Sequence, residues 1–175
     1  VSGAYWNETG LDIPGLIQFR DKNGGTLQGY TQATLISNEA LLTAPVDILI
    51  PAAKEDVITS KNADKIQAKL IVEGANGPTS ANADDIINQK GILVVPDILA
   101  NAGGVTVSYF EWVQNRLGYA WGIDRIQRRS DRMMLDAFDM VYQIAQKYHV
   151  SLRIAAYIVA IDKVAKTYQF RGGGW

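Results

Sequence analysis

The sequence predicts an α/β fold in which a parallel sheet is followed by helices, and two observations support this prediction. Up to residue 101, short apolar runs alternate with segments of helical pattern, which is typical of strand–helix–strand units. From residue 102 onward only helical periodicity is found. The 175 residues are 47% hydrophobic and 20% charged, so we expect an ordinary globular domain and no long disordered segment.

Three apolar runs are predicted to be the strands of the sheet. They span residues 47–50, 69–72 and 91–95, and each is bounded by proline, glycine or a charged residue. Because these runs are continuous and do not alternate with polar residues, we expect both faces of their sheet to be buried. Residues 33–37 form a fourth, weaker strand candidate.

Helices are predicted on either side of these strands. Residues 14–21 follow a possible N-cap at Asp12, and residues 80–89 carry Asp84 and Asp85 early, where the helix dipole favours acidic side chains.

The C-terminal part is predicted to be entirely helical. Helices are expected over residues 102–115, 125–148 and 151–170, the last two with an apolar stripe at helical spacing. The run Gly172–Gly174 is expected to end the ordered structure.

The sheet has fewer strands than a complete fold of this type. A doubly wound dinucleotide-binding sheet has about six strands, so we expect its first strands to precede Val1. The absence of a starting methionine favours the same interpretation, truncation or processing.

Composition excludes several function classes. Without cysteine there can be no disulfide or thiolate zinc site, and with His149 as the only histidine we expect no metal site. The formal net charge of -1 gives no reason to expect nucleic acid as a partner. With no signal peptide and no apolar run near the roughly 18 residues of a membrane span, we expect no membrane association and a cytoplasmic location.

The strongest candidate site is the segment Pro96–Ser108, which follows the third predicted strand directly. In an open α/β sheet, ligands bind beyond the carboxyl ends of the strands. If a helix begins near Asn101, then Asn101, Gly104, Val105 and Ser108 share one face, and that face is small and polar. Close packing of the helix on the sheet is an equally good explanation of the glycines.

Two further strand ends belong to the same predicted edge. Asn76 lies between glycines after the second strand; a plain turn residue is the simpler interpretation, but its position beside Asn101 favours a binding role. Ala52 and Ala53 follow the first strand and could form a shallow floor for a flat ring.

Other residues are better explained by structure than by chemistry. The arginines at 125, 128, 129 and 132 are interleaved with acidic residues, which indicates a solvated or subunit-contacting face. His149 is expected to cap a helix, and Trp112 and Trp121 to lie in the core or an interface. No G-x-G-x-x-G turn and no P-loop is present.

Several of these motifs together resemble the glutamate dehydrogenase family. The resemblance is carried by residues 72–79 and 96–115, and residues 3–13 and 47–53 are similar to the family as well. It extends over essentially the whole chain. It implies a partial Rossmann-like dinucleotide-binding domain at 1–115, followed by a helical segment at 116–175 that packs on it and toward a missing substrate domain.

The resemblance also implies roles for particular residues. Asn101 would contact the nicotinamide carboxamide, Asn76 would lie near the nicotinamide ribose, and Ala52 with Ala53 would line the cofactor. Ser108 would help to bind the substrate side-chain carboxylate, with Val105 in the same pocket. No catalytic residue is expected in this chain, because the family's lysine and aspartate belong to the N-terminal domain.

The implied reaction is the reversible oxidative deamination of L-glutamate to 2-oxoglutarate and ammonia with NAD or NADP. Ser108 favours glutamate, since a buried hydroxyl would match an apolar substrate poorly, by about 1–3 kcal/mol. We expect a homo-oligomer, a hexamer in the parent enzyme, and no activity in the isolated chain. The alternatives are a non-catalytic nucleotide-binding or assembly module and a branched-chain or aromatic amino-acid dehydrogenase.

Overall fold

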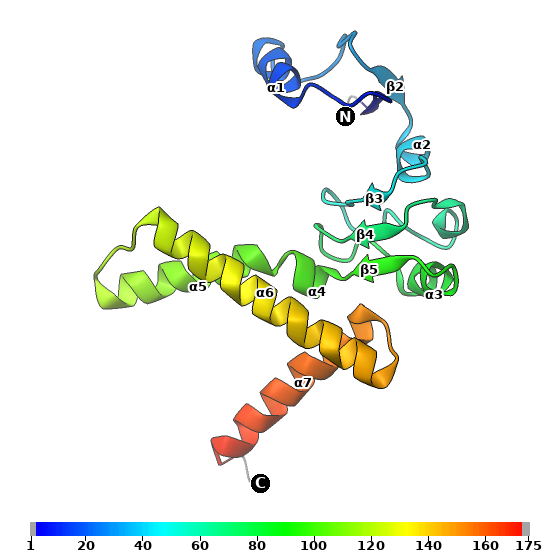
Figure 1. Ribbon diagram of the computed structural model, residues 1–175. Coiled ribbons are helices and arrows are strands. Elements are labelled where there is room, and N and C mark those ends of the chain that lie inside the picture. Colours follow the sequence, from blue (N-terminus) through cyan, green and yellow to red (C-terminus); the bar gives the residue numbers. More distant parts are fainter. Residues whose placement is uncertain (1–2, 173–175) are drawn as a thin grey trace.

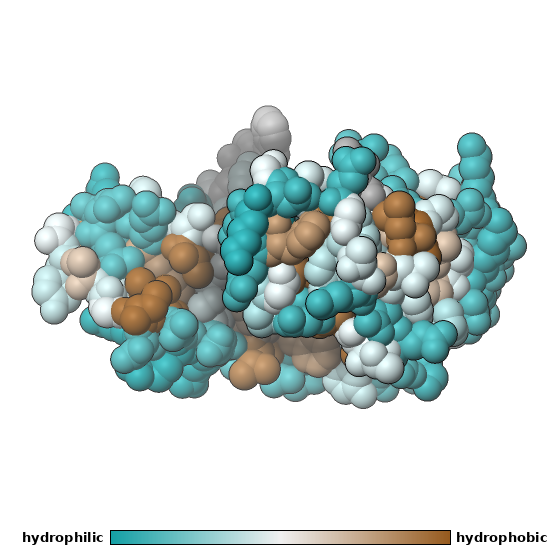
Figure 2. All heavy atoms as spheres, turned by 90° about the horizontal axis from the view of Figure 1, so that it is seen from above, coloured by the Kyte–Doolittle hydropathy of each residue, from teal (hydrophilic) through white to brown (hydrophobic). Residues whose placement is uncertain are grey.

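The protein is built from three consecutive parts that are arranged in an elongated molecule (Figure 1). The computed structural model describes residues 3–172, so the predictions for Val1 and for the glycines after 172 lie outside the described residues. A small N-terminal lobe is followed by a parallel sheet and then by long helices. Large hydrophobic side chains stay exposed along the chain, and Figure 2 shows hydrophobic patches between hydrophilic side chains.

The N-terminal lobe contains a two-stranded antiparallel sheet. Strand β1 (Ala4–Trp6) pairs with β2 (Thr34–Ile36), and helix α1 (Ile13–Lys22) lies between them in the sequence. The Asp12 carboxylate accepts a hydrogen bond from the Gly15 N–H at 3.1 Å, which confirms the predicted cap. The weak strand candidate at 33–37 is confirmed as a strand, but it belongs to this lobe and not to the parallel sheet.

The parallel sheet consists of the three predicted strands. Strands β3 (Ile48–Leu49), β4 (Leu70–Val72) and β5 (Leu93–Val95) pair in the order β3-β4-β5. Short helical elements lie around them in the sequence: α2 (Asn38–Leu42), the 3₁₀ turn η1 (Ala63–Lys65) and α3 (Ala81–Gln89). The α/β prediction is therefore confirmed.

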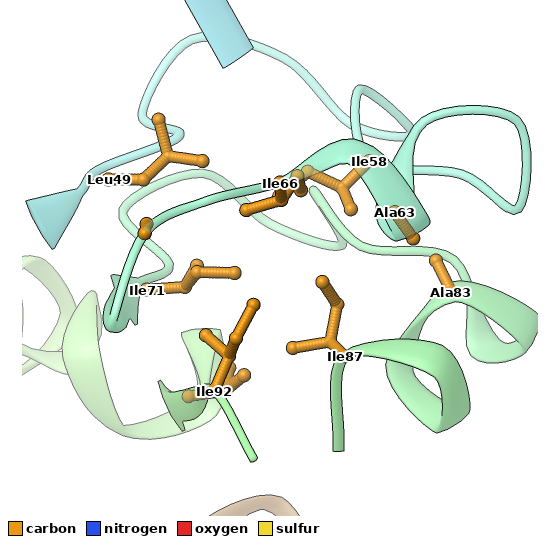
Figure 3. Close-up of a cluster of buried hydrophobic side chains, with 10 residues drawn as sticks. Leu49, Ile58, Ala63, Ile66, Ile71, Ala83, Ile87 and Ile92 are labelled. Carbon is orange, nitrogen blue, oxygen red and sulfur yellow. The ribbon is translucent and has the colours of Figure 1, made fainter. Parts of the chain in front are cut away.

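One face of this sheet carries the main core (Figure 3). Leu49, Ile71 and Val94 point to this face and pack with residues of η1 and α3, including the fully buried Ile87. On the opposite face Ile48 and Leu93 are each 54% exposed. Ile50, directly after β3, is 59% exposed as well. The expectation of a sheet buried on both faces is therefore wrong for the first predicted run and for the amino-terminal end of β5.

The C-terminal helices form a second core. Helices α4 (Asp97–Ala100), α5 (Ala102–Leu117), α6 (Ile123–Tyr148) and α7 (Leu152–Phe170) confirm the predicted helical region. Residues of α4, α6 and α7 bury one another, and α7 also contacts β5. Helix α5 continues across residue 115, and the proposed domain division there stays a prediction. Within residues 3–172, no helix combines the length and apolar composition needed to cross a membrane.

Candidate functional site

The carboxyl ends of the three parallel strands border one cavity of about 680 Å³. Each strand is followed by a loop or by the start of a helix, and these segments form the wall of the cavity. Parallel strands place these segments at the same edge of the sheet. The lining residues are Ala52, Ala53, Lys54, Glu55, Gly74, Ala75, Asn76, Asn101 and Val105. The structure therefore brings together five of the six site residues expected from the sequence.

Two of the three strand-end loops are in tight contact. A Cβ atom on Gly74 would lie 2.9 Å from the Cβ of Ala52, closer than side chains approach one another. The Ala75 N–H also donates to the Pro51 carbonyl at 2.9 Å. Glycine is therefore required at position 74 for the close approach of these two loops, which both line the cavity.

Asn76 and Asn101 are hydrogen-bonded to each other, and we call them the amide pair. The Asn101 Nδ2–H donates to the Asn76 Oδ1 at 2.6 Å. This bond leaves the side-chain Nδ2 of Asn76 and the side-chain Oδ1 of Asn101 available at the cavity wall. The pair thus offers a donor and an acceptor side by side, which is the pattern that a primary carboxamide can match.

The first turns of α5 form a small and open surface, the α5 face, made by Gly104, Val105 and Ser108. A Cβ atom on Gly103 or Gly104 would meet nothing within 4 Å, so these glycines do not serve close helix–sheet packing. Val105 is 69% exposed. Ser108 is exposed one turn beyond the cavity, and its hydroxyl donates to the Gly104 carbonyl at 3.1 Å.

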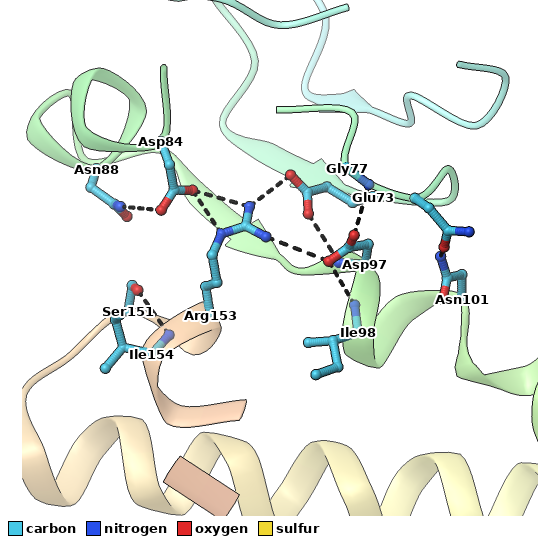
Figure 4. Close-up of polar contacts among 11 residues, drawn as sticks. Glu73, Gly77, Asp84, Asn88, Asp97, Ile98, Asn101, Ser151, Arg153 and Ile154 are labelled. Atoms are coloured by element: carbon cyan, nitrogen blue, oxygen red, sulfur yellow. Dashed lines mark hydrogen bonds and ion pairs between the residues drawn. The ribbon is translucent and has the colours of Figure 1, made fainter. Parts of the chain in front are cut away.

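A largely buried ionic group, the Arg153 cluster, consists of Arg153, Glu73, Asp84 and Asp97 (Figure 4). No motif in the sequence predicts it. The Arg153 guanidinium donates from Nη2 to Glu73 Oε1 at 2.7 Å and from Nε to Asp84 Oδ1 at 3.0 Å. Its Nη1 lies 3.5 Å from Asp97 Oδ1. Glu73 is fully buried, and the side chain of Arg153 is 17% exposed.

The cluster keeps Arg153 charged. Burial alone would lower the pKa of its guanidinium, but the hydrogen bond and charge of Glu73, together with those of Asp84, raise that pKa above its ordinary value. From the sequence, Asp84 is expected only to complement the dipole of α3. In the structure it also accepts a hydrogen bond from Arg153.

One signal for the cluster was present in the sequence. An arginine in the first turn of α7 opposes the helix dipole, and such a cation needs nearby carboxylates. The partners of Arg153 could not be identified from the sequence, because Glu73 lies 80 residues away along the chain.

The remaining candidates have structural surroundings. His149 is the C-cap residue of α6, as expected. Arg125 and Arg129 flank the ring of Trp121 at 4.6 and 4.5 Å from its centroid, whereas Trp112 is exposed and stacks on Tyr109. Among residues 3–172, no three histidine or acidic side chains are arranged to hold a metal ion.

Comparison with known proteins adds a family to this geometry. A sequence profile of the Glutamate/Leucine/Phenylalanine/Valine dehydrogenase family matches residues 1–172. The chain is 51% identical over 170 residues to a glutamate dehydrogenase of Thermotoga maritima, covering 97% of this chain and 41% of that protein. It is 48% identical over 172 residues to a catabolic NAD-specific glutamate dehydrogenase of Bacillus subtilis, covering 98% and 40%.

Solved structures give the same match in three dimensions. A hetero-hexameric glutamate dehydrogenase from Thermus thermophilus superposes with a TM-score of 0.86 at 26% identity, covering 99% of this chain and 40% of that one. The chain thus spans about two fifths of the length of the curated relatives that it matches.

Proposed function

Because the chain belongs to the Glutamate/Leucine/Phenylalanine/Valine dehydrogenase family, we propose that it forms part of an NAD(P)-dependent glutamate dehydrogenase. In this proposal the chain supplies the nicotinamide side of the cofactor site and one wall of the substrate pocket. The reaction is the reversible oxidative deamination of L-glutamate to 2-oxoglutarate and ammonia. The amide pair at the cavity wall is the observation that carries the proposal.

The residues present fit a nicotinamide cofactor. The cavity of about 680 Å³ offers room for a flat ring beside Ala52 and Gly74, and a side chain at position 74 would push their two loops apart. The free donor of Asn76 and the free acceptor of Asn101 can both pair with one carboxamide. When bound, the cofactor accepts or returns the hydride, and the chain's own contribution is to fix which ring face is presented.

The α5 face is the proposed wall for the substrate. Val105 borders the same cavity as the amide pair, and Ser108 follows it one turn later on α5. A hydroxyl at this place can donate to a side-chain carboxylate of glutamate, whereas an apolar side chain would leave it unpaired. The groups that remove protons from the amino acid would come from outside residues 3–172.

Glutamate is supported by the names of both relatives described above, and NAD by the name of the Bacillus subtilis enzyme. The Thermus thermophilus enzyme supports an oligomeric assembly by its hetero-hexameric state. We therefore propose that the protein acts as an oligomer.

The proposal is tested by assaying the full-length protein that contains this chain. We expect glutamate-dependent reduction of NAD or NADP, with much slower turnover of leucine and phenylalanine. Preferred turnover of leucine or phenylalanine would assign a different member of the same family. Cofactor binding without turnover of any amino acid would favour a non-catalytic nucleotide-binding module.

A further inference from the structure

The Arg153 cluster lies beside Gly77 and Asn101, the residue after Asn76 and the other member of the amide pair (Figure 4). Three carboxylates surround one guanidinium in a largely buried place, so none of them can be released without leaving charge unpaired. Arg153 forms its hydrogen bonds and ion pairs with these three carboxylates and not with Asn76 or Asn101. Its effect on the cavity must therefore pass through its partners.

Asp97 connects the cluster to both members of the amide pair. Its Oδ2 accepts a hydrogen bond from the Gly77 N–H at 2.8 Å, which holds the residue next to Asn76. Its backbone carbonyl accepts the Asn101 N–H at 3.1 Å. Its own N–H donates to Glu73 Oε2 at 2.9 Å, so Asp97 is fixed in turn by a partner of Arg153.

We infer that Arg153 is a positioning residue for the cofactor site. It holds Glu73 and Asp97 in the orientation that fixes the loop of Asn76 and the backbone of Asn101 at the start of α5. In this way it sets the distance between the two side-chain amides. This inference rests on the proposed function, since it assumes that the amide pair binds the nicotinamide cofactor.

Removal of the guanidinium would disturb this arrangement for an electrostatic reason. Without the cation, the carboxylates of Glu73 and Asp97 lie close together in a place of low dielectric, where two negative charges repel. One of them would turn to solvent or take up a proton. The Gly77 N–H or the Asp97 N–H would then lose its acceptor, and the two loops would move independently.

A purely structural role predicts a different outcome. Arg153 also joins α7 to the sheet, so any substitution will reduce stability to some extent. In that case an equal loss of stability elsewhere at the α6–α7 contact should disturb the cofactor site equally. Val141 offers this control, since it is buried in the second core with Leu152 and Ala155 and is not part of the cluster.

The test measures the dissociation constant for NADH by fluorescence titration of the full-length protein. We expect Arg153→Met to weaken NADH binding roughly tenfold. Arg153→Lys keeps the positive charge but loses the planar guanidinium that reaches several carboxylates at once, and we expect it to weaken binding about threefold. Val141→Ala should leave the dissociation constant unchanged at a comparable loss of melting temperature. Hydrogen exchange at the Gly77 N–H should accelerate in both Arg153 variants and not in Val141→Ala.

Each other outcome has a definite meaning. Unchanged NADH binding in Arg153→Lys overturns the inference while leaving the proposed function intact, and this variant keeps the test valid if Arg153→Met does not fold. Equal weakening in Val141→Ala reduces Arg153 to a structural contact and overturns the inference as well. A wild-type protein that binds no NADH overturns the proposed function, and the inference with it.

Discussion

The amide pair and Val105 of the α5 face border the same cavity, but the pair and this face are held in place very differently. Asn76 and Asn101 are joined to each other and fixed through Asp97 to a buried ionic cluster. Val105 and Ser108 project from an exposed helix surface with no contact of comparable strength. The difference indicates that the proposed cofactor side is preorganised by this chain, whereas the proposed substrate side needs a further element to cover it.

The largest expected effect is at the centre of the preorganised region. Glu73→Ala removes a fully buried partner of Arg153 and the acceptor of the Asp97 N–H. Breaking such a buried pair costs about 3–5 kcal/mol, which should appear as a marked fall in the urea midpoint of the full-length protein. Asp162→Ala is the control, because its ion pair with Lys166 is exposed and should contribute under about 1 kcal/mol. Similar losses in both variants would show that the Arg153 cluster is not a special source of stability.

The two kinds of glycine provide a second comparison. Gly74→Ala places a methyl group 2.9 Å from Ala52 and should cost about 1–3 kcal/mol, with weaker NADH binding. Gly103→Ala points into open space in the first turn of α5, where alanine should be favoured over glycine by at most about 1 kcal/mol. Thermal unfolding of the two variants should therefore shift in opposite directions. A stabilised Gly74→Ala variant would contradict the tight contact between the strand-end loops.

The smallest effect on stability is expected on the α5 face. Ser108→Val replaces an exposed residue, so the free energy of unfolding should change by at most about 0.5 kcal/mol. Its effect on activity is specific: the KM for glutamate should rise about tenfold, because the proposed partner of the carboxylate is lost, while NADH binding stays the same. Steady-state kinetics that show equal losses for glutamate and cofactor would argue against the role of Ser108.

The strands, the helices and the residues that follow the strands could be predicted, because each depends on a local sequence pattern. The apolar runs that become β3, β4 and β5 locate the strands, and parallel topology then brings Ala52, Asn76 and Asn101 to one edge. The helix periods of α5, α6 and α7 are equally local signals.

Contacts between distant residues could not be predicted in this way. Strand β2 was expected near the parallel sheet, but it pairs with β1 in the N-terminal lobe, and three-residue strands carry too little pattern to specify a partner. Arg153 and Glu73 are 80 residues apart, so no spacing rule joins them. The choice between close packing and an open surface at Gly103 and Gly104 also required coordinates, because the sequence pattern is the same for both.

The most direct test of the central claim is the dissociation constant for NADH in Asn101→Ala, compared with Ser108→Ala, in the full-length protein. If the amide pair binds the nicotinamide side of the cofactor, Asn101→Ala should bind NADH roughly ten times more weakly. Ser108→Ala should bind it as the wild-type protein does. Unchanged binding in Asn101→Ala, or an equal loss in both variants, would contradict the account.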